Sequence, residues 1–85
     1  MHVTVISPEA SKYDGPADSV VAPAYDGRVG ILPRHAPFMT LLGTGLLVVR
    51  QAGTERRFTV HGGFLQVVDD TVRVVTEQLD EVLDG

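Results

Sequence analysis

Histidines are the residues of this chain best suited to hold a metal or to transfer a proton. The sequence has three, His2, His35 and His61, and they lie far apart along the chain. Zinc and iron sites usually take two ligands from one short motif such as H-x-H or H-x-x-x-H, and neither motif occurs. The spacing therefore predicts no metal site, and no cofactor is expected from the residue types.

Nucleophilic catalysis and phosphate binding find equally little support. A Ser-His-Asp triad can assemble from distant residues, but no serine lies on a glycine-flanked elbow, and so small a domain leaves little room for a substrate pocket. The glycine pairs at 43/45 and 62/63 lack the Lys-Ser/Thr ending of a phosphate loop, so they predict turns instead. We therefore do not expect an enzyme.

His35 differs from the other two histidines because it lies between Pro33 and Pro37. Each proline fixes φ, removes a backbone donor and favours extended geometry in the residue before it. The segment from Gly30 to Pro37 therefore predicts a rigid, shaped loop and neither a helix nor a central strand. Such a loop would present His35 for a contact at little loss of entropy. Equally, the prolines could only shape a connection, with His35 incidental, and the residues alone leave both interpretations open.

Size and composition predict one small folded domain over residues 1–85. Hydrophobic residues make up 44% of the chain, well above the content of disordered segments. There are no cysteines, which excludes disulfides and thiolate metal sites. The N-terminus shows no secretory signal, and the most apolar region, residues 38–49, is interrupted and shorter than the roughly 20 residues of a membrane helix.

The charge distribution argues against nucleic acid as a partner. The formal net charge is −4, Lys12 is the single lysine, and the arginines are interleaved with acidic residues. Nucleic-acid-binding proteins concentrate basic side chains on one face because counterion release drives their affinity. No such concentration is visible in the sequence.

Turn signals recur at short, regular intervals, a spacing typical of a β-sandwich or barrel. The expected turns lie at residues 7–8, 13–16, 26–27, 52–53, 62–63 and 69–70. Strands are expected at residues 3–5, 19–22, 46–51, 56–61, 64–68 and 72–76. Many strand positions are apolar on both faces, which favours two packed sheets. Residues 77–84 stay ambiguous, because their apolar residues have helical spacing but follow a strand without an N-cap.

Three stretches resemble the epsilon subunit of F-type ATP synthases, whose mitochondrial homologue is called delta. Residues 27–37, Gly-Arg-Val-Gly-Ile-Leu-Pro-Arg-His-Ala-Pro, are similar to that family's G-x-x-G-I-L-P-x-H-A/T-P signature. Residues 60–67, Val-His-Gly-Gly-Phe-Leu-Gln-Val, are similar to its V-S-G-G-F-x-E-V stretch, and residues 5–15 fit its opening. The resemblance runs in register over nearly the whole chain, and the stretch at 30–37 is its most specific part.

The resemblance implies an all-β fold, a two-sheet antiparallel β-sandwich of about ten short strands with the tail as its last strand. It also implies a non-catalytic rotor subunit at the foot of the central stalk of a proton-translocating ATP synthase. In that family the domain binds the gamma subunit and the loops of the membrane-embedded c-ring, so the protein would be membrane-proximal without spanning the membrane. In a bacterium that location is the cytoplasmic face of the cell membrane.

The resemblance also assigns residues to partners. The gamma-subunit contacts would be Ser7, Lys12, Tyr13, His35 and Thr40. The c-ring contacts would be Arg28 and Val29, in the loop that meets the ring. The structural turns would be at Gly30, Pro33, Pro37, Gly62 and Gly63.

The chain departs from the family pattern at two positions and at its end. His61 replaces the usual serine and Gln66 the usual glutamate, changes that disturb neither fold nor partner. The family's C-terminal two-helix arm is expected to be absent, since the sequence stops at Gly85, so the arm's inhibition of ATP hydrolysis and its ATP binding are not carried over.

Other classes remain as rivals. A lipoyl or biotinyl carrier needs its modified lysine on a mid-chain hairpin, and Lys12 does not fit that position. A small enzyme or ligand-binding barrel and a generic β-sandwich interaction module are the remaining alternatives, and fold alone does not separate the latter from the epsilon interpretation.

Overall fold

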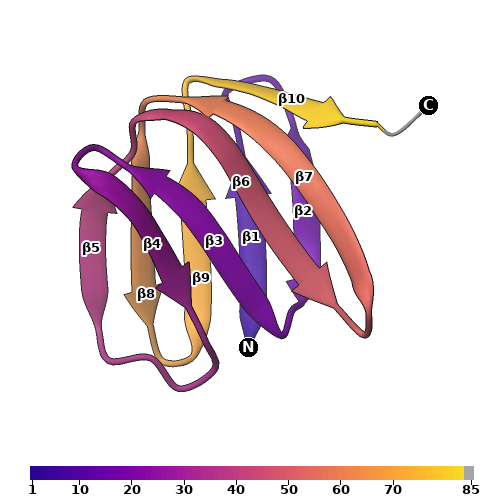
Figure 1. The fold of residues 1–85 in the computed structure, drawn as a ribbon, viewed down its shortest axis with the longest axis vertical. Coiled ribbons are helices and arrows are strands. Elements are labelled where there is room, and N and C mark those ends of the chain that lie inside the picture. Colours follow the sequence, from indigo (N-terminus) through magenta and orange to yellow (C-terminus); the bar gives the residue numbers. More distant parts are fainter. Residues whose placement is uncertain (84–85) are drawn as a thin grey trace.

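The structure, a computed structural model, describes residues 1–83 as a two-layered all-β sandwich. Ten strands and no helix occur in this described part of the chain (Figure 1). The strands are β1 (His2–Ile6), β2 (Ser11–Pro16), β3 (Ser19–Ala24), β4 (Gly27–Ile31), β5 (Phe38–Leu41), β6 (Thr44–Gln51), β7 (Thr54–His61), β8 (Phe64–Val68), β9 (Thr71–Val75) and β10 (Gln78–Val82). The predicted fold class is confirmed.

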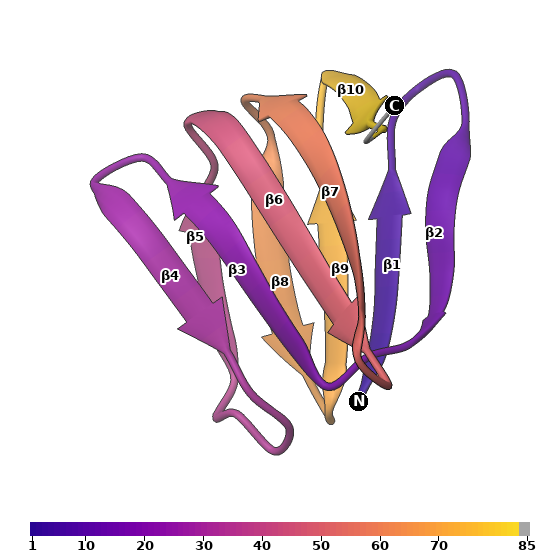
Figure 2. The same ribbon diagram turned by 45° about the vertical axis from the view of Figure 1, so that its right-hand side comes forward.

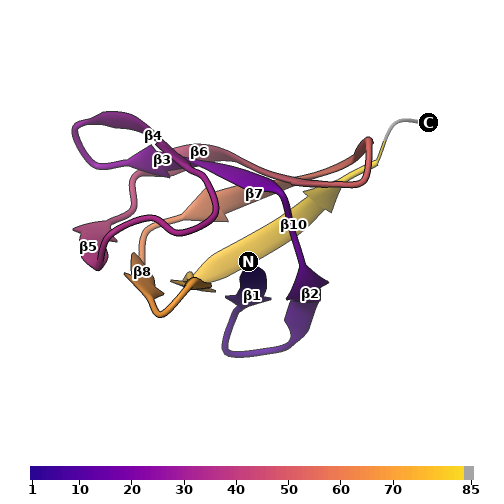
Figure 3. The same cartoon turned by 90° about the horizontal axis from the view of Figure 1, so that it is seen from below.

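Each layer is a sheet of five strands. The first sheet has the order β2-β1-β9-β8-β5 and the second has the order β10-β7-β6-β3-β4. Viewed from below, the layers lie face to face, with β4 and β5 at one flank and β2 and β10 at the other (Figure 3). One pairing departs from the expected antiparallel pattern, because β1 runs parallel to β9.

Strict alternation of side chains builds the core between the sheets. In the first sheet Val3 and Val5 are fully buried, while the residues between and beside them are not. In the second sheet Phe58 and Val60 of β7 are fully buried, as their shared face predicted. Phe58 is the largest fully buried side chain. The other large side chains that are fully buried are those of isoleucine, leucine and valine, so the core is mainly branched aliphatic.

Two hairpins form where the sequence predicted them. The β6–β7 turn has φ of 50° at Ala52 and 80° at Gly53, and the β8–β9 turn has φ of 50° at Asp69 and 57° at Asp70. Positive φ at both central residues gives the turn whose twist matches that of the flanking strands. Asp and Gly tolerate this conformation, so Gly53, Asp69 and Asp70 made both turns predictable, whereas Ala52 adopts positive φ without such a preference.

Gly63 permits the chain to cross from the second sheet to the first. Its φ is 98°, and a Cβ placed there would lie 1.9 Å from the carbonyl oxygen of Val75. The chain returns to the second sheet beside the same point, where the buried Thr76 hydroxyl accepts a hydrogen bond from the His61 amide at 3.2 Å. Only glycine fits position 63, and the predicted turn at residues 62–63 is confirmed.

Several local predictions were wrong. The predicted turn at residues 13–16 is part of β2, an edge strand, where glycine and proline are tolerated because only one side is paired. The strand expected to end at residue 22 continues to Ala24, and the next turn shifts by one residue to Tyr25 and Asp26. Gly30 is not in a turn, because it lies in β4 opposite Val21.

The shaped loop predicted at residues 30–37 is limited to residues 32–37, because Gly30 and Ile31 belong to the edge strand β4. The ambiguous tail is resolved as a strand, since β10 pairs with β7 from Gln78 to Val82. Asp84, the last residue of that ambiguous segment, lies outside the described residues.

Candidate interaction surface

The loop at residues 32–37 connects β4 of the second sheet to β5 of the first and projects from the lower end of the molecule (Figure 2). The His35 ring lies against Phe38, with ring centroids 5.7 Å apart and an angle of 60° between the planes. Its Nδ1 donates a hydrogen bond to the Ala36 carbonyl at 2.7 Å. The side chain is half-buried and not fully displayed, so part of His35 supports the loop and its other edge stays accessible.

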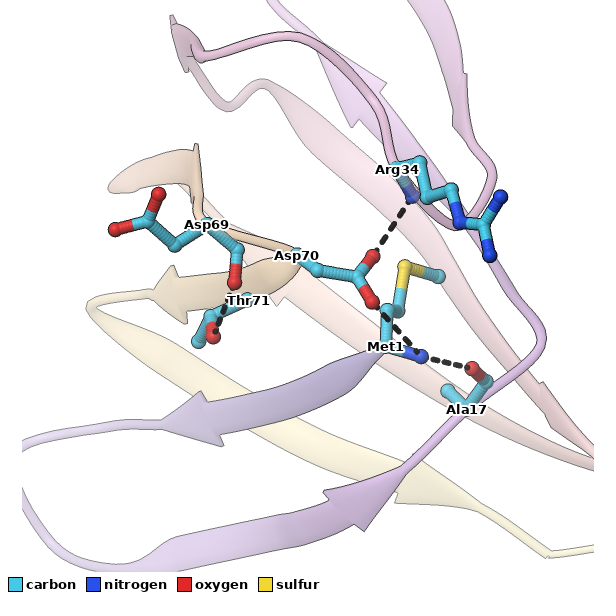
Figure 4. Close-up of polar contacts among 6 residues, drawn as sticks. All are labelled: Met1, Ala17, Arg34, Asp69, Asp70 and Thr71. Atoms are coloured by element: carbon cyan, nitrogen blue, oxygen red, sulfur yellow. Dashed lines mark hydrogen bonds and ion pairs between the residues drawn. The ribbon is translucent and has the colours of Figure 1, made fainter.

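Asp70 anchors this loop from the β8–β9 turn. Its Oδ1 accepts a hydrogen bond of 2.7 Å from the backbone amide of Arg34, a residue with φ of 66° (Figure 4). Its Oδ2 lies 3.7 Å from the α-ammonium of Met1, which also donates to the Ala17 carbonyl at 3.3 Å. One carboxylate therefore links the loop at residues 32–37, which we call the His35 loop, to the end of the first sheet.

The flank formed by β4 and β5 carries a groove, and we call it the groove flank. The groove has a volume of about 630 Å³, and its lining includes Tyr25, Val29, Phe38, Met39 and Leu41. Three of these side chains are large and strongly exposed, with exposed fractions of 69% for Tyr25, 61% for Met39 and 63% for Leu41. Exposed apolar side chains clustered in one place are typical of an interaction site.

The opposite flank, formed by β2, β7 and β10, is closed by Arg56, and we call it the Arg56 flank. The Arg56 guanidinium pairs with both carboxylate oxygens of Glu81, at 2.9 and 2.8 Å. It also lies over the rings of Tyr13 and Phe58, at 5.3 and 5.4 Å from their centroids. The hydrogen bonds to Glu81 raise the pKa of Arg56, and those from Arg56 lower the pKa of Glu81.

The five residues expected to contact gamma do not form one cluster. Ser7, Lys12 and Tyr13 lie at the β1–β2 edge of the first sheet, whereas His35 and Thr40 lie at its β5 edge. Three strands separate the two groups, which corresponds to about 19 Å between the edge strands at the usual spacing.

Internal contacts distinguish these five residues further. Ser7 donates to the Ala10 carbonyl at 3.4 Å, and the Tyr13 hydroxyl donates to the Pro16 carbonyl at 2.5 Å. With Arg56 over its ring, Tyr13 is well engaged within the chain itself. Lys12 is exposed, while Thr40 is half-buried in the lining of the groove.

The two residues expected to contact the c-ring are neighbours on β4 and not in a loop. Arg28 is exposed, and its guanidinium donates to the Leu46 carbonyl at 3.0 Å. Val29 is half-buried and packs against the core. Both also line the groove, so the structure brings them close to Thr40 of β5.

Other kinds of site find no support in the described part of the chain. No group of three or more His, Cys, Asp or Glu side chains within residues 1–83 could hold a metal ion. Among the same residues there is no helix long and apolar enough to cross a membrane.

Two features of this surface were not predicted from the sequence. Asp70 was expected only as a turn residue, and its bond to Arg34 could not be foreseen because 36 positions separate them. The groove lining was also missed, since it combines the turn at Tyr25 with β5 residues that are distant in sequence. Exposed Met39 and Leu41 within a short apolar strand were the one available signal.

Comparison with protein families gives a match over nearly the whole chain. The family described as "ATP synthase, Delta/Epsilon chain, beta-sandwich domain" matches residues 1–81. The ATP synthase epsilon chain of Leptospira borgpetersenii is 44% identical over 77 residues, covering 91% of this chain and 61% of the relative. That of Maricaulis maris is 37% identical over 84 residues, covering 99% and 63%. The chain thus spans about three fifths of the length of these curated relatives.

Solved structures share the fold at low sequence identity. A chain of the Euglena gracilis mitochondrial ATP synthase, from a structure of OSCP, F1 and the c-ring, superposes with a TM-score of 0.87. It is 22% identical, and the match covers 93% of this chain and 51% of that one. A chain from the central stalk and c-ring of the Tetrahymena thermophila enzyme has a TM-score of 0.80 at 20% identity, covering 94% and 65%. At these identities the likeness establishes the fold alone.

Proposed function

Because the chain belongs to the delta/epsilon family of ATP synthase subunits through its β-sandwich domain, we propose that it is a non-catalytic rotor subunit. It binds the gamma subunit and the c-ring and so couples ion-driven rotation to ATP synthesis. The observation that carries the proposal is the family match over residues 1–81, which includes the whole His35 loop. Residues 1–85 are proposed to act as one interaction domain that makes and breaks no covalent bond itself.

The gamma-binding surface is proposed to include the five residues carried over from the family resemblance, Ser7, Lys12, Tyr13, His35 and Thr40. Support is strongest for His35 and Thr40, because the anchored loop and the exposed apolar groove lie side by side. A loop held in one conformation loses little entropy on binding, and exposed apolar surface supplies a driving force. Lys12 and Tyr13 are proposed to lie at the far margin of the same interface.

The c-ring contact is proposed to involve Arg28 and Val29 on β4. Arg28 is exposed and its guanidinium is a strong hydrogen-bond donor, so it suits contact with polar or acidic loops. In a bacterium the proposed location is therefore the cytoplasmic face of the cell membrane. If the assignment is right, Arg28→Glu should weaken binding to the purified c-ring about tenfold or more while binding to gamma stays unchanged. Equal binding of Arg28→Glu and the unsubstituted chain to the c-ring would contradict the assignment of Arg28.

Substitution of His35 tests the gamma assignment. An interface hot spot loses about 1–4 kcal/mol on truncation, so His35→Ala should weaken binding to the cognate gamma subunit roughly 5- to 1000-fold. Because the ring packs on Phe38, a small loss of about 1 kcal/mol in the free energy of unfolding is expected as well. Calorimetric titration and thermal unfolding measure the two effects separately.

His61→Ala is the matched control, since His61 is also half-buried but lies in β7 of the second sheet. It should leave gamma binding within about twofold of the unsubstituted chain. Intact gamma binding in His35→Ala together with a large fall in melting temperature would make His35 a structural residue. Binding by neither the unsubstituted chain nor its variants would contradict the proposed function as a whole.

A further inference from the structure

The two methionines of the chain lie in opposite surroundings. The sequence holds Met1 and Met39 and no cysteine, so its sulfur atoms are all in thioethers. The Met1 side chain is 1% exposed and packs against the hydrophobic core. Met39 lies on β5 and is 61% exposed. The fold therefore shields one thioether and leaves the other open to small solutes.

Met39 lies in the lining of the groove. Its strand β5 is at the edge of the first sheet and pairs only with β8, where Met39 is opposite Gln66. Phe38, the preceding residue, packs against the core, so alternation along the strand directs the Met39 side chain away from the core. With Tyr25 and Leu41, Met39 supplies the large exposed side chains of the groove lining.

A thioether in this position can react without any opening of the sandwich. Oxidation of methionine follows exposure, and it converts an apolar side chain into a polar sulfoxide. We propose that Met39 is a redox-sensitive site, which hydrogen peroxide oxidises in the free subunit, and that the sulfoxide weakens binding of a partner at the groove. The second half of this proposal rests on the proposed function above, because it takes the gamma subunit as that partner.

The oxidation consumes peroxide and needs no catalytic group. A lone pair on Sδ of Met39 attacks one peroxide oxygen, and the S–O bond forms as the O–O bond breaks. The proton on the transferred oxygen passes to the departing hydroxide, which leaves as water, so sulfur loses an electron pair and the peroxide gains it. A methionine sulfoxide reductase reverses the change, removing the oxygen as water while a pair of thiols forms a disulfide. This chain has no thiol of its own, so the reductase must supply that pair.

The sulfoxide changes the polarity of the groove more than its shape. Its oxygen is a hydrogen-bond acceptor placed among exposed side chains such as those of Tyr25 and Leu41. An apolar group of a partner that covers this oxygen removes its water without replacing the hydrogen bond, which is unfavourable. The core is unaffected, because Met39 points away from it. Oxidation should therefore weaken binding at the groove and leave the fold intact.

Peptide mapping by mass spectrometry, after timed exposure of the folded chain to hydrogen peroxide, tests the site. Met39 should form sulfoxide at least about tenfold faster than Met1, because a side chain packed in the core reacts only when the structure opens locally. In denaturant the difference should disappear, which makes Met1 the matched control within the same chain. Equal rates at the two methionines in the folded chain would overturn the proposal.

Calorimetric titration with the purified cognate gamma subunit tests the consequence. The chain oxidised at Met39 should bind about fivefold or more weakly than the reduced chain, and treatment with a methionine sulfoxide reductase should restore the affinity. Met39→Leu keeps an apolar side chain of similar volume, so its binding should be the same before and after peroxide. Thermal unfolding should give the same melting temperature for the reduced and oxidised chains.

The outcomes separate this inference from the proposed function. Equal gamma binding by the reduced and oxidised chains would overturn the inference and leave the proposed function standing. A loss of binding in peroxide-treated Met39→Leu as large as in the unsubstituted chain would assign the effect to another residue and also overturn it. If the reduced chain itself does not bind gamma, the proposed function is contradicted and the consequence for binding falls with it. Faster oxidation of Met39 than of Met1 would still support the site in that case.

Discussion

At the Arg56 flank the sheets are joined by charged and aromatic side chains, whereas at the groove flank large apolar side chains remain exposed. Arg56 has two carboxylate oxygens and two aromatic rings as partners, so its binding capacity is used within the chain. Tyr25, Met39 and Leu41 on the other flank are more than 60% exposed. One flank therefore stabilises the fold, while the other keeps apolar surface available for a partner.

The largest expected effect is at Gly63, where the chain crosses between the sheets, and Gly30 on the exposed edge strand β4 is its control. A Cβ at Gly63 would overlap the Val75 carbonyl, and the residue has φ of 98°, so Gly63→Ala should lower the free energy of unfolding by about 3 kcal/mol or more. That corresponds to a fall in melting temperature of about 12 °C or more. Gly30→Ala meets nothing within 4 Å on the exposed edge strand and should change stability by less than about 0.5 kcal/mol. Comparable losses in the two variants would contradict the difference in packing.

Removing Arg56 tests whether its flank serves the fold. Arg56→Ala loses the paired hydrogen bonds to Glu81 and two cation–π contacts, which together contribute about 1.5 kcal/mol after allowance for partial exposure. A fall in melting temperature of about 6–12 °C is expected in thermal unfolding. Arg50→Ala is the control, because Arg50 pairs with Glu55 on the exposed surface, and its removal should lower the free energy of unfolding by less than about 0.5 kcal/mol. A loss for Arg50→Ala as large as that for Arg56→Ala would remove the distinction.

Loosening the His35 loop tests how the groove flank is organised. Asp70→Gly keeps the positive φ of the turn but deletes the acceptor of the Arg34 amide, so that amide should exchange with solvent about tenfold faster. A loss of about 1 kcal/mol in the free energy of unfolding should accompany it. Asp69→Asn, at the neighbouring turn position, should leave exchange at Arg34 unchanged. Unaltered exchange in Asp70→Gly would mean that the loop is held by its prolines alone.

The smallest expected effect is the acid sensitivity of the Arg56 flank. Arg56 lowers the pKa of Glu81 in the folded state, so this pair stabilises the fold fully above the unfolded-state pKa of Glu81. The contribution is lost as the pH falls through the lowered pKa of the folded state. Between pH 5 and pH 3, denaturant unfolding should therefore show a smaller loss of stability for Glu81→Gln than for the unsubstituted chain, by about 0.5 kcal/mol. Identical pH dependence of the two chains would contradict this linkage.

The parts of the fold that were predictable are those set by local chemistry. The turns at 52–53 and 69–70 were found because Gly53, Asp69 and Asp70 are of residue types that tolerate the positive φ that such turns need, although Ala52 adopts it as well. The strands beside them followed from alternation. The turn predicted at residues 13–16 failed because pairing with β1 overrides local turn preference on an edge strand.

The site was predictable only where one short segment carries it. The two prolines predicted a shaped loop around His35, and residues 32–37 form one. Its anchor and the groove each depend on how distant strands and turns lie side by side, and nothing local specifies that Asp70 lies beside Arg34. The contacts assigned to gamma and the c-ring stay predictions until the variants above are measured.

The parallel pairing of β1 with β9 has a consequence for how the chain folds during synthesis. His2 pairs with Thr71 and Ile6 with Val75, so β1 can complete its pairing only after the chain has been synthesised as far as β9. Closing so long a loop is entropically unfavourable, and folding dominated by such distant contacts is slow. Until β9 emerges, β1 has only β2 as a hydrogen-bonded partner, and a two-stranded hairpin is marginally stable in water. The first sheet therefore gains its central pairing only after β9 has been synthesised.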